Sequence, residues 1–322
     1  MLSVGFDLGG TNLRAAIYGS DATTPIARHR EPVGDARSPD QIAQRLCDVT
    51  DRLTVEAAEA GTPVCIGVGL AAMLRGTDGV VANSPHLRWR DVAFGALLAV
   101  KLGDRPFVIY NDVDAVTYGE YKAGAAMGKH DTLAVFVGTG IGGGVIANGQ
   151  LVRGATSCAG EIGHTKVAFD DDALPCNCGR RGCIEAYTGG HYLQRRIRRE
   201  LSGGARSAAV RLAGGDAHQV NPGHLDAAAA EGDDYALNLY QELAPLLGAT
   251  LANAITLLNP SCLLLGGGMM SRTPVFRDHV VMAMEVAANP PALADLDVVD
   301  SALGDDAGLV GSALLARQHF DS

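Results

Sequence analysis

Clustered positive charge is scarce in this chain. Lysine and arginine together number 26, against 36 aspartates and glutamates, which gives a formal net charge of -10 at pH 7. A surface that binds nucleic acid needs lysine and arginine gathered on one face, so this balance argues against a nucleic-acid partner. The only basic run lies within residues 195–199, and apolar residues recur beside it at helical spacing. We therefore expect it to be the solvated face of an amphipathic helix.

Long apolar segments are missing as well. The most apolar stretch, residues 243–258, is interrupted by Pro245, Asn253 and Thr256, and it is shorter than the roughly 20 residues that a membrane-spanning helix needs. The start of the sequence shows no basic segment ahead of an apolar run, so no secretory signal is visible. We therefore expect no membrane partner and a soluble protein of the cytoplasm.

The overall composition is that of a globular protein. Hydrophobic residues make up 47% of the chain and charged residues 19%, and 322 residues suffice for two domains that each bury a core. The 41 glycines indicate many tight turns. The only tryptophan, Trp89, falls in a predicted loop. Apolar patterning predicts strands near 25–30, 64–70, 107–110, 261–265 and 296–301, and helices over 39–60, 113–126, 235–258, from 273 onward and over 305–317.

Three of the seven cysteines fall within eight residues. Cys176, Cys178 and Cys183 with the upstream His164 form a Cys3His set, a complete tetrahedral shell for zinc that leaves no position for water. Glycines inside the motif favour the tight turns of a structural zinc site, whereas an oxidised cysteine pair is the alternative interpretation of the C-x-C spacing. The other cysteines are expected to be small buried hydrophobes in a reducing compartment: Cys47, Cys65, Cys158 and Cys262.

Two glutamates flank this predicted zinc site. Glu161 precedes His164 by three residues, and Glu185 follows Cys183 by two. A metal that fixes both segments would also fix this pair of carboxylates, which suits a pocket for sugar hydroxyls.

A glycine-rich hairpin occurs twice in the chain. Residues 3–18 predict two strands joined by a polar turn whose backbone N–H groups can face an anion, and residues 132–148 repeat the plan about 130 positions later. This duplication suggests two related domains that share a nucleotide, whereas two ordinary hairpin turns are the alternative. Asp7 ends the first strand and can orient a hydrated magnesium ion. The candidate phosphate contacts are Gly9, Gly10, Thr11, Asn12, Gly138, Thr139 and Gly140.

Two further strand ends carry candidate ligand residues. Asn111 and Asp112 stand where a predicted strand ends and a helix begins, and ligands of open α/β sheets bind at such carboxyl ends. The spacing alone leaves Asp112 equally suited to cap the helix. Gly266, Gly267 and Gly268 follow another buried strand and leave bare backbone against which adenine or ribose can lie.

The order of these motifs resembles the ROK family of bacterial sugar kinases and sugar-responsive repressors. The motifs are D-L-G-G-T-N, the N-D pair, V-G-T-G-I-G-G-G, G-E-I-G-H, C-N-C-G-R-R-G-C-I-E and L-L-L-G-G-G, and they span nearly the whole chain. The resemblance implies an actin-like ATPase fold of the ribonuclease H type, with two α/β domains around a central cleft and a zinc-binding loop. The smaller domain is expected over residues 1–112, joined by the C-terminal helix over 305–322, and the larger domain over 113–304.

The resemblance also implies roles for single residues. Asp112 matches the catalytic base of the family, residues 138–140 match its second phosphate turn, and Gly266 and Gly267 match its adenosine side. ATP with Mg²⁺ is then the expected cofactor, Zn²⁺ the structural ion, a hexose the substrate and a homodimer the assembly. The residues that match groups binding sugar hydroxyls are Asn111, Glu161, His164 and Glu185.

One departure from the family concerns the sugar. The family usually has Pro-Gly after the strand at 64–70, whereas this chain has Ala-Ala-Met at 71–73. The loop with Asn83, Leu87 and Trp89 resembles the glucokinase version, so we expect Asn83 in the sugar site and phosphorylation of glucose at O6. Kinases of N-acetylglucosamine, N-acetylmannosamine or fructose are the alternatives. A repressor would carry a winged helix ahead of the first hairpin, for which the sequence leaves no room, and a non-catalytic sugar-binding regulator is a remote alternative.

Overall fold

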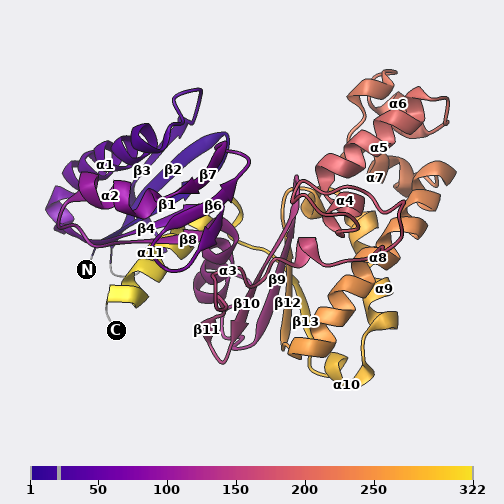
Figure 1. The fold of residues 1–322 in the computed structure, drawn as a ribbon. Coiled ribbons are helices and arrows are strands. Elements are labelled where there is room, and N and C mark those ends of the chain that lie inside the picture. Colours follow the sequence, from indigo (N-terminus) through magenta and orange to yellow (C-terminus); the bar gives the residue numbers. More distant parts are fainter. Residues whose placement is uncertain (1, 20–22, 321–322) are drawn as a thin grey trace. The chain divides into compact units, whose positions relative to one another are not determined.

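The structure of the chain is a computed structural model that describes residues 2–19 and 23–320. It divides into two α/β units (Figure 1). Unit 1 comprises residues 1–130, 144–160 and 301–322, and unit 2 comprises residues 131–143 and 161–300. Two α/β domains with mixed sheets, as predicted from the sequence, are therefore observed.

The sheet of unit 1 has the strand order β3-β2-β1-β4-β8. The predicted first hairpin is β1 (Leu2–Leu8) with β2 (Asn12–Tyr18), and β3 (Pro25–Pro32) pairs antiparallel with β2. In contrast, β4 (Pro63–Leu70) and β8 (Phe107–Asn111) extend the sheet parallel to β1. Their register places Leu8 beside Leu70 and Leu70 beside Asn111. The residues that follow these three strands therefore leave the sheet at one edge.

A small antiparallel sheet follows β4, in the order β5-β6-β7. Its strands are β5 (Met73–Arg75), β6 (Val80–Ser84) and β7 (Trp89–Val92). Trp89 thus begins a strand, and the prediction of a loop at this residue is wrong. The Trp89 indole is buried against the Phe94 ring at 4.9 Å, and its Nε1–H donates to the carbonyl of Arg37 at 2.7 Å, so packing determines its place.

Helices cover both faces of the unit 1 sheet. On one side, the core contains buried residues of α1 (Pro39–Glu56) and α2 (Phe94–Leu102). The other side is covered by α3 (Asp112–Ala123) and α11 (Ala307–Phe320), with the short helices η1 (Ala58–Ala60) and η5 (Gly304–Asp306) elsewhere in the unit. The approach of α11 is close, since a Cβ at Gly67 would lie 1.9 Å from the Ser312 carbonyl oxygen.

The sheet of unit 2 is part of a five-stranded sheet with the order β11-β10-β9-β12-β13. The predicted second hairpin is β9 (Thr132–Val137) with β10 (Ile141–Ala147), and β11 (Gln150–Leu151) follows it. Parallel to β9 run β12 (Cys262–Gly266) and, next to it, β13 (Asp297–Asp300).

Unit 2 contains the remaining helices of the described residues. Helix α8 continues through Pro245, and no helix of the described residues is long and apolar enough to cross a membrane. The predicted amphipathic helix is α5, but its Arg196 is not simply solvated, because it pairs with Glu200 and Glu242. The bounds are η2 (Ile162–His164), α4 (Glu185–Thr188), α5 (Gly190–Ser202), α6 (Ala208–Leu212), η3 (Ala217–Gln219), α7 (Pro222–Ala230), α8 (Asp234–Leu258), η4 (Met270–Arg272), α9 (Pro274–Ala287) and α10 (Pro290–Leu293).

Candidate functional site

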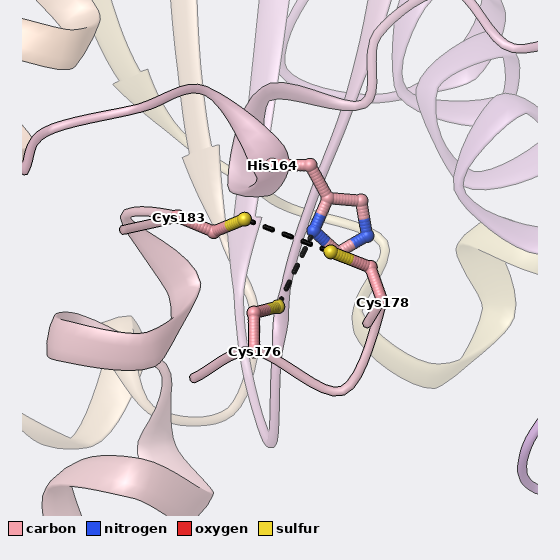
Figure 2. A group of neighbouring side chains, drawn as sticks. All are labelled: His164, Cys176, Cys178 and Cys183. Atoms are coloured by element: carbon pink, nitrogen blue, oxygen red, sulfur yellow. Dashed lines mark hydrogen bonds between the residues drawn. The ribbon is translucent and has the colours of Figure 1, made fainter. Parts of the chain in front are cut away.

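The four predicted zinc ligands converge in unit 2 (Figure 2). His164, Cys176, Cys178 and Cys183 offer ligand atoms that all lie within 4.8 Å of one another. The Sγ atoms of Cys178 and Cys183 are 3.6 Å apart, and Cys176 Sγ is 3.7 Å from His164 Nδ1. In a zinc tetrahedron with bonds of about 2.0–2.3 Å the ligand atoms are about 3.4–3.8 Å apart, so these spacings fit the ion. All three cysteines are free thiols, and the alternative of an oxidised pair is not adopted.

The loop that carries the cysteines is shaped by two glycines. We call residues 175–183 the zinc knuckle; an isolated bridge between Pro175 and Arg181 closes it. Gly179 and Gly182 adopt φ of 84° and 77°, a left-handed conformation that disfavours other residues. A Cβ at Gly182 would also lie 2.0 Å from the Ala168 carbonyl oxygen. The glycines therefore permit the turn that brings the thiols together.

A lysine balances the charge of the cluster. Three thiolates and a neutral imidazole give Zn²⁺ a net charge of -1, and Lys166 Nζ lies 2.8 Å from Cys183 Sγ. Burial raises the pKa of Cys176 to about 12, and a metal bound here would displace the proton of this thiol. The donor set and its surroundings thus suit a structural zinc ion.

The two predicted glutamates lie beside this cluster. Glu161 Oε2 is 3.9 Å from His164 Nε2, so one imidazole nitrogen faces the cysteines and the other faces the carboxylate. Burial raises the pKa of Glu161, His164 lowers it and Glu185 raises it further. Glu185 begins α4; its Oε2 accepts the Ile141 N–H at 2.9 Å, and its Oε1 lies 3.7 Å from Cys176 Sγ. The structure thus brings Glu161, His164 and Glu185 together in unit 2.

The remaining predicted sugar residues lie in unit 1, at the edge where β4 and β8 end. Asn111 Oδ1 accepts the N–H groups of Val113 at 2.7 Å and Asp114 at 3.3 Å, so Asn111 is the N-cap of α3. Asp112 is the first residue of α3, directly after this N-cap. The Asn111 side-chain amide donates to the Ala72 carbonyl at 3.0 Å, which ties the N-D pair to the turn at residues 71–73.

Asn83 is placed by the small sheet. It lies on β6 opposite Met73 of β5, and the neighbouring Ser84 donates its hydroxyl to the Ala71 carbonyl at 2.7 Å. Asn83 and Asn111 are therefore both connected to the turn at 71–73, in which the chain departs from the family pattern.

The first glycine turn also lies in unit 1. Gly9, Gly10 and Thr11 join β1 to β2, which begins with Asn12, and the Gly9 N–H donates to the Asn12 carbonyl at 3.1 Å. Gly10 packs on His86, whose Cβ lies 2.7 Å from the position of an added Cβ, so the turn has room only for glycine there.

Asp7 lies just ahead of this turn and is mostly buried. Its carboxylate is 2.6 Å from an Arg14 guanidinium nitrogen. Burial raises the pKa of Asp7, and Arg14 opposes that rise.

A cavity of about 480 Å³ opens at the ends of β9 and β12 in unit 2. The predicted Gly138 and Thr139 line it, whereas Gly140 faces Glu185 and Gly266 is a buried strand residue. Gly267 supports the wall, since its φ is 92° and a Cβ there would lie 2.4 Å from the Val137 carbonyl oxygen. The cavity is also lined by Gly190, His191, Gln194, Asn221, Pro222, Gly223, Gly268, Met269, Arg272 and Thr273.

Several of these lining residues were not predicted from the sequence. His191 and Gln194 come from α5, Asn221 from the start of α7, and Arg272 from η4. Only Asn221 had a local signal, because Asn before Pro is a helix start and its Oδ1 accepts the His224 N–H at 3.1 Å. The others are gathered by tertiary folding.

Comparison with known proteins gives the family. The model of the ROK family matches residues 3–319. The chain belongs to the ROK family. It is 32% identical over 323 residues to a glucokinase of Streptomyces coelicolor, with 98% of each chain covered. It is 28% identical over 320 residues to an N-acetylmannosamine kinase of Escherichia fergusonii, with 98% of this chain and 99% of the relative covered.

A solved ROK structure is similar over the whole chain. The crystal structure of a ROK family glucokinase from Streptomyces griseus in complex with glucose and AMPPNP superposes with a TM-score of 0.78 at 29% identity, covering 99% of this chain and 100% of that one. The predicted family and fold are thereby confirmed. The relatives include kinases of two different sugars, so family membership leaves the sugar of this ROK protein to be argued from its own residues.

Proposed function

We propose that this protein is an ATP-dependent hexose kinase that phosphorylates glucose at O6. The observation that carries the proposal is the position of Asp112, which follows the parallel strand β8 while Asn111 caps the helix. A carboxylate directly after the carboxyl end of a parallel strand lies at the edge of the sheet where open α/β sheets bind their ligands. In this proposal the side chain of Asp112 acts on the sugar rather than on its own helix.

Asp112 serves as the general base. Its carboxylate accepts the proton of the sugar 6-hydroxyl while that oxygen forms a bond to the γ-phosphorus and the bond from phosphorus to the ADP oxygen breaks. The products are the sugar 6-phosphate, ADP and the proton. A positioned base contributes about 10²–10⁴-fold in rate, which is roughly 3–5 kcal/mol of activation free energy.

The other polar groups orient the sugar. We assign the hydrogen bonds to sugar hydroxyls to Asn83, Asn111, Glu161, His164 and Glu185. A site that forms hydrogen bonds with sugar hydroxyls binds sugars lacking those hydroxyls more weakly. Its carboxylates and amides would then be buried without partners, which costs free energy. The shared location of Glu161, His164 and Glu185 beside the zinc cluster supports this assignment.

The cavity of unit 2 is the proposed nucleotide site. Gly138, Thr139 and Gly140 present the phosphate turn, Gly266 and Gly267 support the adenosine side, and in unit 1 the turn of Gly9, Gly10, Thr11 and Asn12 is the second phosphate contact. Asp7 provides one hard oxygen donor, which suits Mg²⁺ because that ion keeps several waters. When bound, Mg²⁺ neutralises charge on the β- and γ-phosphates.

Glucose is the proposed substrate, and an N-acetylated hexose is the second candidate. Glucose is favoured by the similarity to glucokinases over the whole length, and by the segment with Asn83, Leu87 and Trp89, which resembles the glucokinase version. The second candidate rests on the Ala-Ala-Met turn at 71–73, which stands beside Asn111 in place of the usual Pro-Gly, and on the relative named as an N-acetylmannosamine kinase. We also propose a homodimer, which light scattering after gel filtration tests.

The substrate is tested with a coupled ADP-release assay. Wild-type protein with MgATP is offered glucose, mannose, fructose, N-acetylglucosamine and N-acetylmannosamine. We expect kcat/KM to favour glucose by about a hundredfold, or ~2.7 kcal/mol. A preference for an N-acetylated sugar would select the second candidate, and no turnover with any of these sugars would refute the kinase proposal.

A further inference from the structure

The segment that follows the zinc knuckle donates hydrogen bonds to the turn at residues 138–140. The Gly190 N–H donates to the Gly138 carbonyl and the His191 N–H to the Thr139 carbonyl, each at 2.9 Å. Gly190 and His191 are the first residues of α5, which has no side-chain cap. The first N–H groups of a helix lack partners within the helix, and here the 138–140 turn satisfies two of them.

Glu185 makes a third connection to the same turn. Its Oε2 accepts the N–H of Ile141, the residue directly after the turn, at 2.9 Å. A Cβ on residue 140 would lie 2.4 Å from this oxygen, so Gly140 is what lets the carboxylate approach. A hydrogen bond to an ionised carboxylate is shorter and stronger than one between neutral groups. One oxygen of Glu185 is thus engaged by the turn.

The zinc cluster is joined to this arrangement through Glu185. The glutamate follows the ligand Cys183 by two residues, and its Oε1 lies 3.7 Å from Cys176 Sγ. The Gly189 N–H, at the end of α4, donates back to the Glu185 carbonyl at 2.9 Å and leads into Gly190. The metal ligands, α4, the start of α5 and the 138–140 turn therefore form one hydrogen-bonded block within unit 2.

We propose that Glu185 is a positioning residue for the nucleotide site, and that it and the zinc knuckle hold the 138–140 turn in its binding conformation. The inference rests on the proposed kinase function and deepens it, because Glu185 then serves the nucleotide through Oε2 and the sugar through Oε1. Gly138, Thr139, Gly190 and His191 all line the cavity, so a shift of the block changes its wall. Nucleotide affinity should therefore depend on Glu185 even without sugar.

The test is MgADP binding by isothermal titration calorimetry in the absence of sugar. Glu185→Ala removes the acceptor of the Ile141 N–H and should weaken MgADP binding about ten-fold or more. Glu185→Gln keeps an amide oxygen at this place and should stay within about three-fold of wild type. Glu161→Ala is the matched control, since it removes a neighbouring carboxylate that has no hydrogen bond to the turn among the described residues, and MgADP affinity should be retained.

Hydrogen exchange separates this inference from the kinase proposal. In Glu185→Ala the amides of residues 138–141 should exchange faster while α8 keeps its protection, which shows that the fold is intact. Wild-type MgADP affinity together with unchanged exchange at 138–141 in Glu185→Ala would overturn the positioning role. If the wild-type protein binds no MgADP, the kinase proposal fails, whereas the exchange result still decides whether Glu185 holds the turn.

Discussion

The side-chain amide of Asn111 donates a hydrogen bond to the main-chain carbonyl of Ala72 at a distance of 3.0 Å. The same side chain caps the helix that starts with Asp112. One residue therefore fixes both the start of α3 and the 71–73 turn, in which this chain departs from the family. Asn111 therefore positions both the proposed base and the turn that we propose determines sugar specificity.

Replacing Asn111 by serine separates these two tasks. Serine is about as good an N-cap as asparagine, so the free energy of unfolding of Asn111→Ser should lie within about 1 kcal/mol of the wild-type value. Serine lacks the amide that donates to the Ala72 carbonyl, so the 71–73 turn beside the proposed sugar site loses this hydrogen bond. The KM for the hexose should therefore rise about ten-fold, while the KM for ATP should change less than about two-fold. Steady-state kinetics with each substrate varied in turn checks this. A parallel rise in both KM values would contradict the assignment.

Loss of one zinc ligand should lower the stability of the protein. Cys178→Ser leaves an incomplete shell, and because zinc binding is coupled to folding we expect less bound metal, a lower melting temperature and weaker sugar binding. Metal analysis of purified protein measures the first effect. Cys158→Ser is the control, since Cys158 lies outside the cluster and should leave the zinc content unchanged. Active wild-type protein without bound zinc would refute the site.

Glu120 should be among the residues on which the stability of unit 1 most depends. It is 1% exposed, and its carboxylate accepts the N–H groups of Ala125, Ala302 and Leu303 at 2.8–2.9 Å. Glu120→Ala leaves these donors unpaired, so the free energy of unfolding should fall by about 3–5 kcal/mol. Urea unfolding measures it, with the exposed Glu59→Ala expected within about 0.5 kcal/mol of wild type. A similar small change for both variants would contradict this role.

The Arg196–Glu242 pair predicts a pH dependence. Hydrogen bonds from Arg196, at 2.6 Å to each oxygen, lower the pKa of Glu242 below its ordinary value of 4.5. A lowered carboxyl pKa stabilises the fold above pH 4.5, and this contribution is lost as the pH falls through the folded pKa.

Glu242→Gln removes this contribution. Since the Glu242 side chain is 54% exposed, the variant should lose at most about 1 kcal/mol near pH 7. The difference from wild type should shrink in urea unfolding below about pH 4.5. A stability difference between the variant and wild type that grows as the pH falls would contradict the predicted direction of the pH dependence.

The features predictable from sequence are those with a short, chemically restrictive spacing. Cys176, Cys178 and Cys183 lie within eight residues, and the two glycine turns are bounded by apolar strands, so local patterns suffice to locate the zinc ligands and both hairpins. Small residues also permit the close packing of α11, since a Cβ at Gly311 would lie 1.7 Å from the Ala115 carbonyl oxygen.

What could not be predicted depends on tertiary contacts. Helix α2 is almost uniformly apolar and lacks the 3.6-residue alternation that identifies a helix, and Trp89 becomes a strand residue because its ring packs on Phe94. The cavity residues His191 and Arg272 are separated by about 80 positions, and no local pattern joins them. The bond from Glu185 to Ile141 is similarly non-local.

The most direct test of the account is the turnover of Asp112→Asn. The variant keeps the size and polarity of the side chain but cannot accept the hydroxyl proton, so kcat for the preferred hexose should fall by about 10²–10⁴-fold while MgADP affinity stays at the wild-type value. A coupled ADP-release assay and calorimetry measure the two quantities. Wild-type turnover in Asp112→Asn would contradict the assignment of Asp112 as the base, and with it the proposed mechanism.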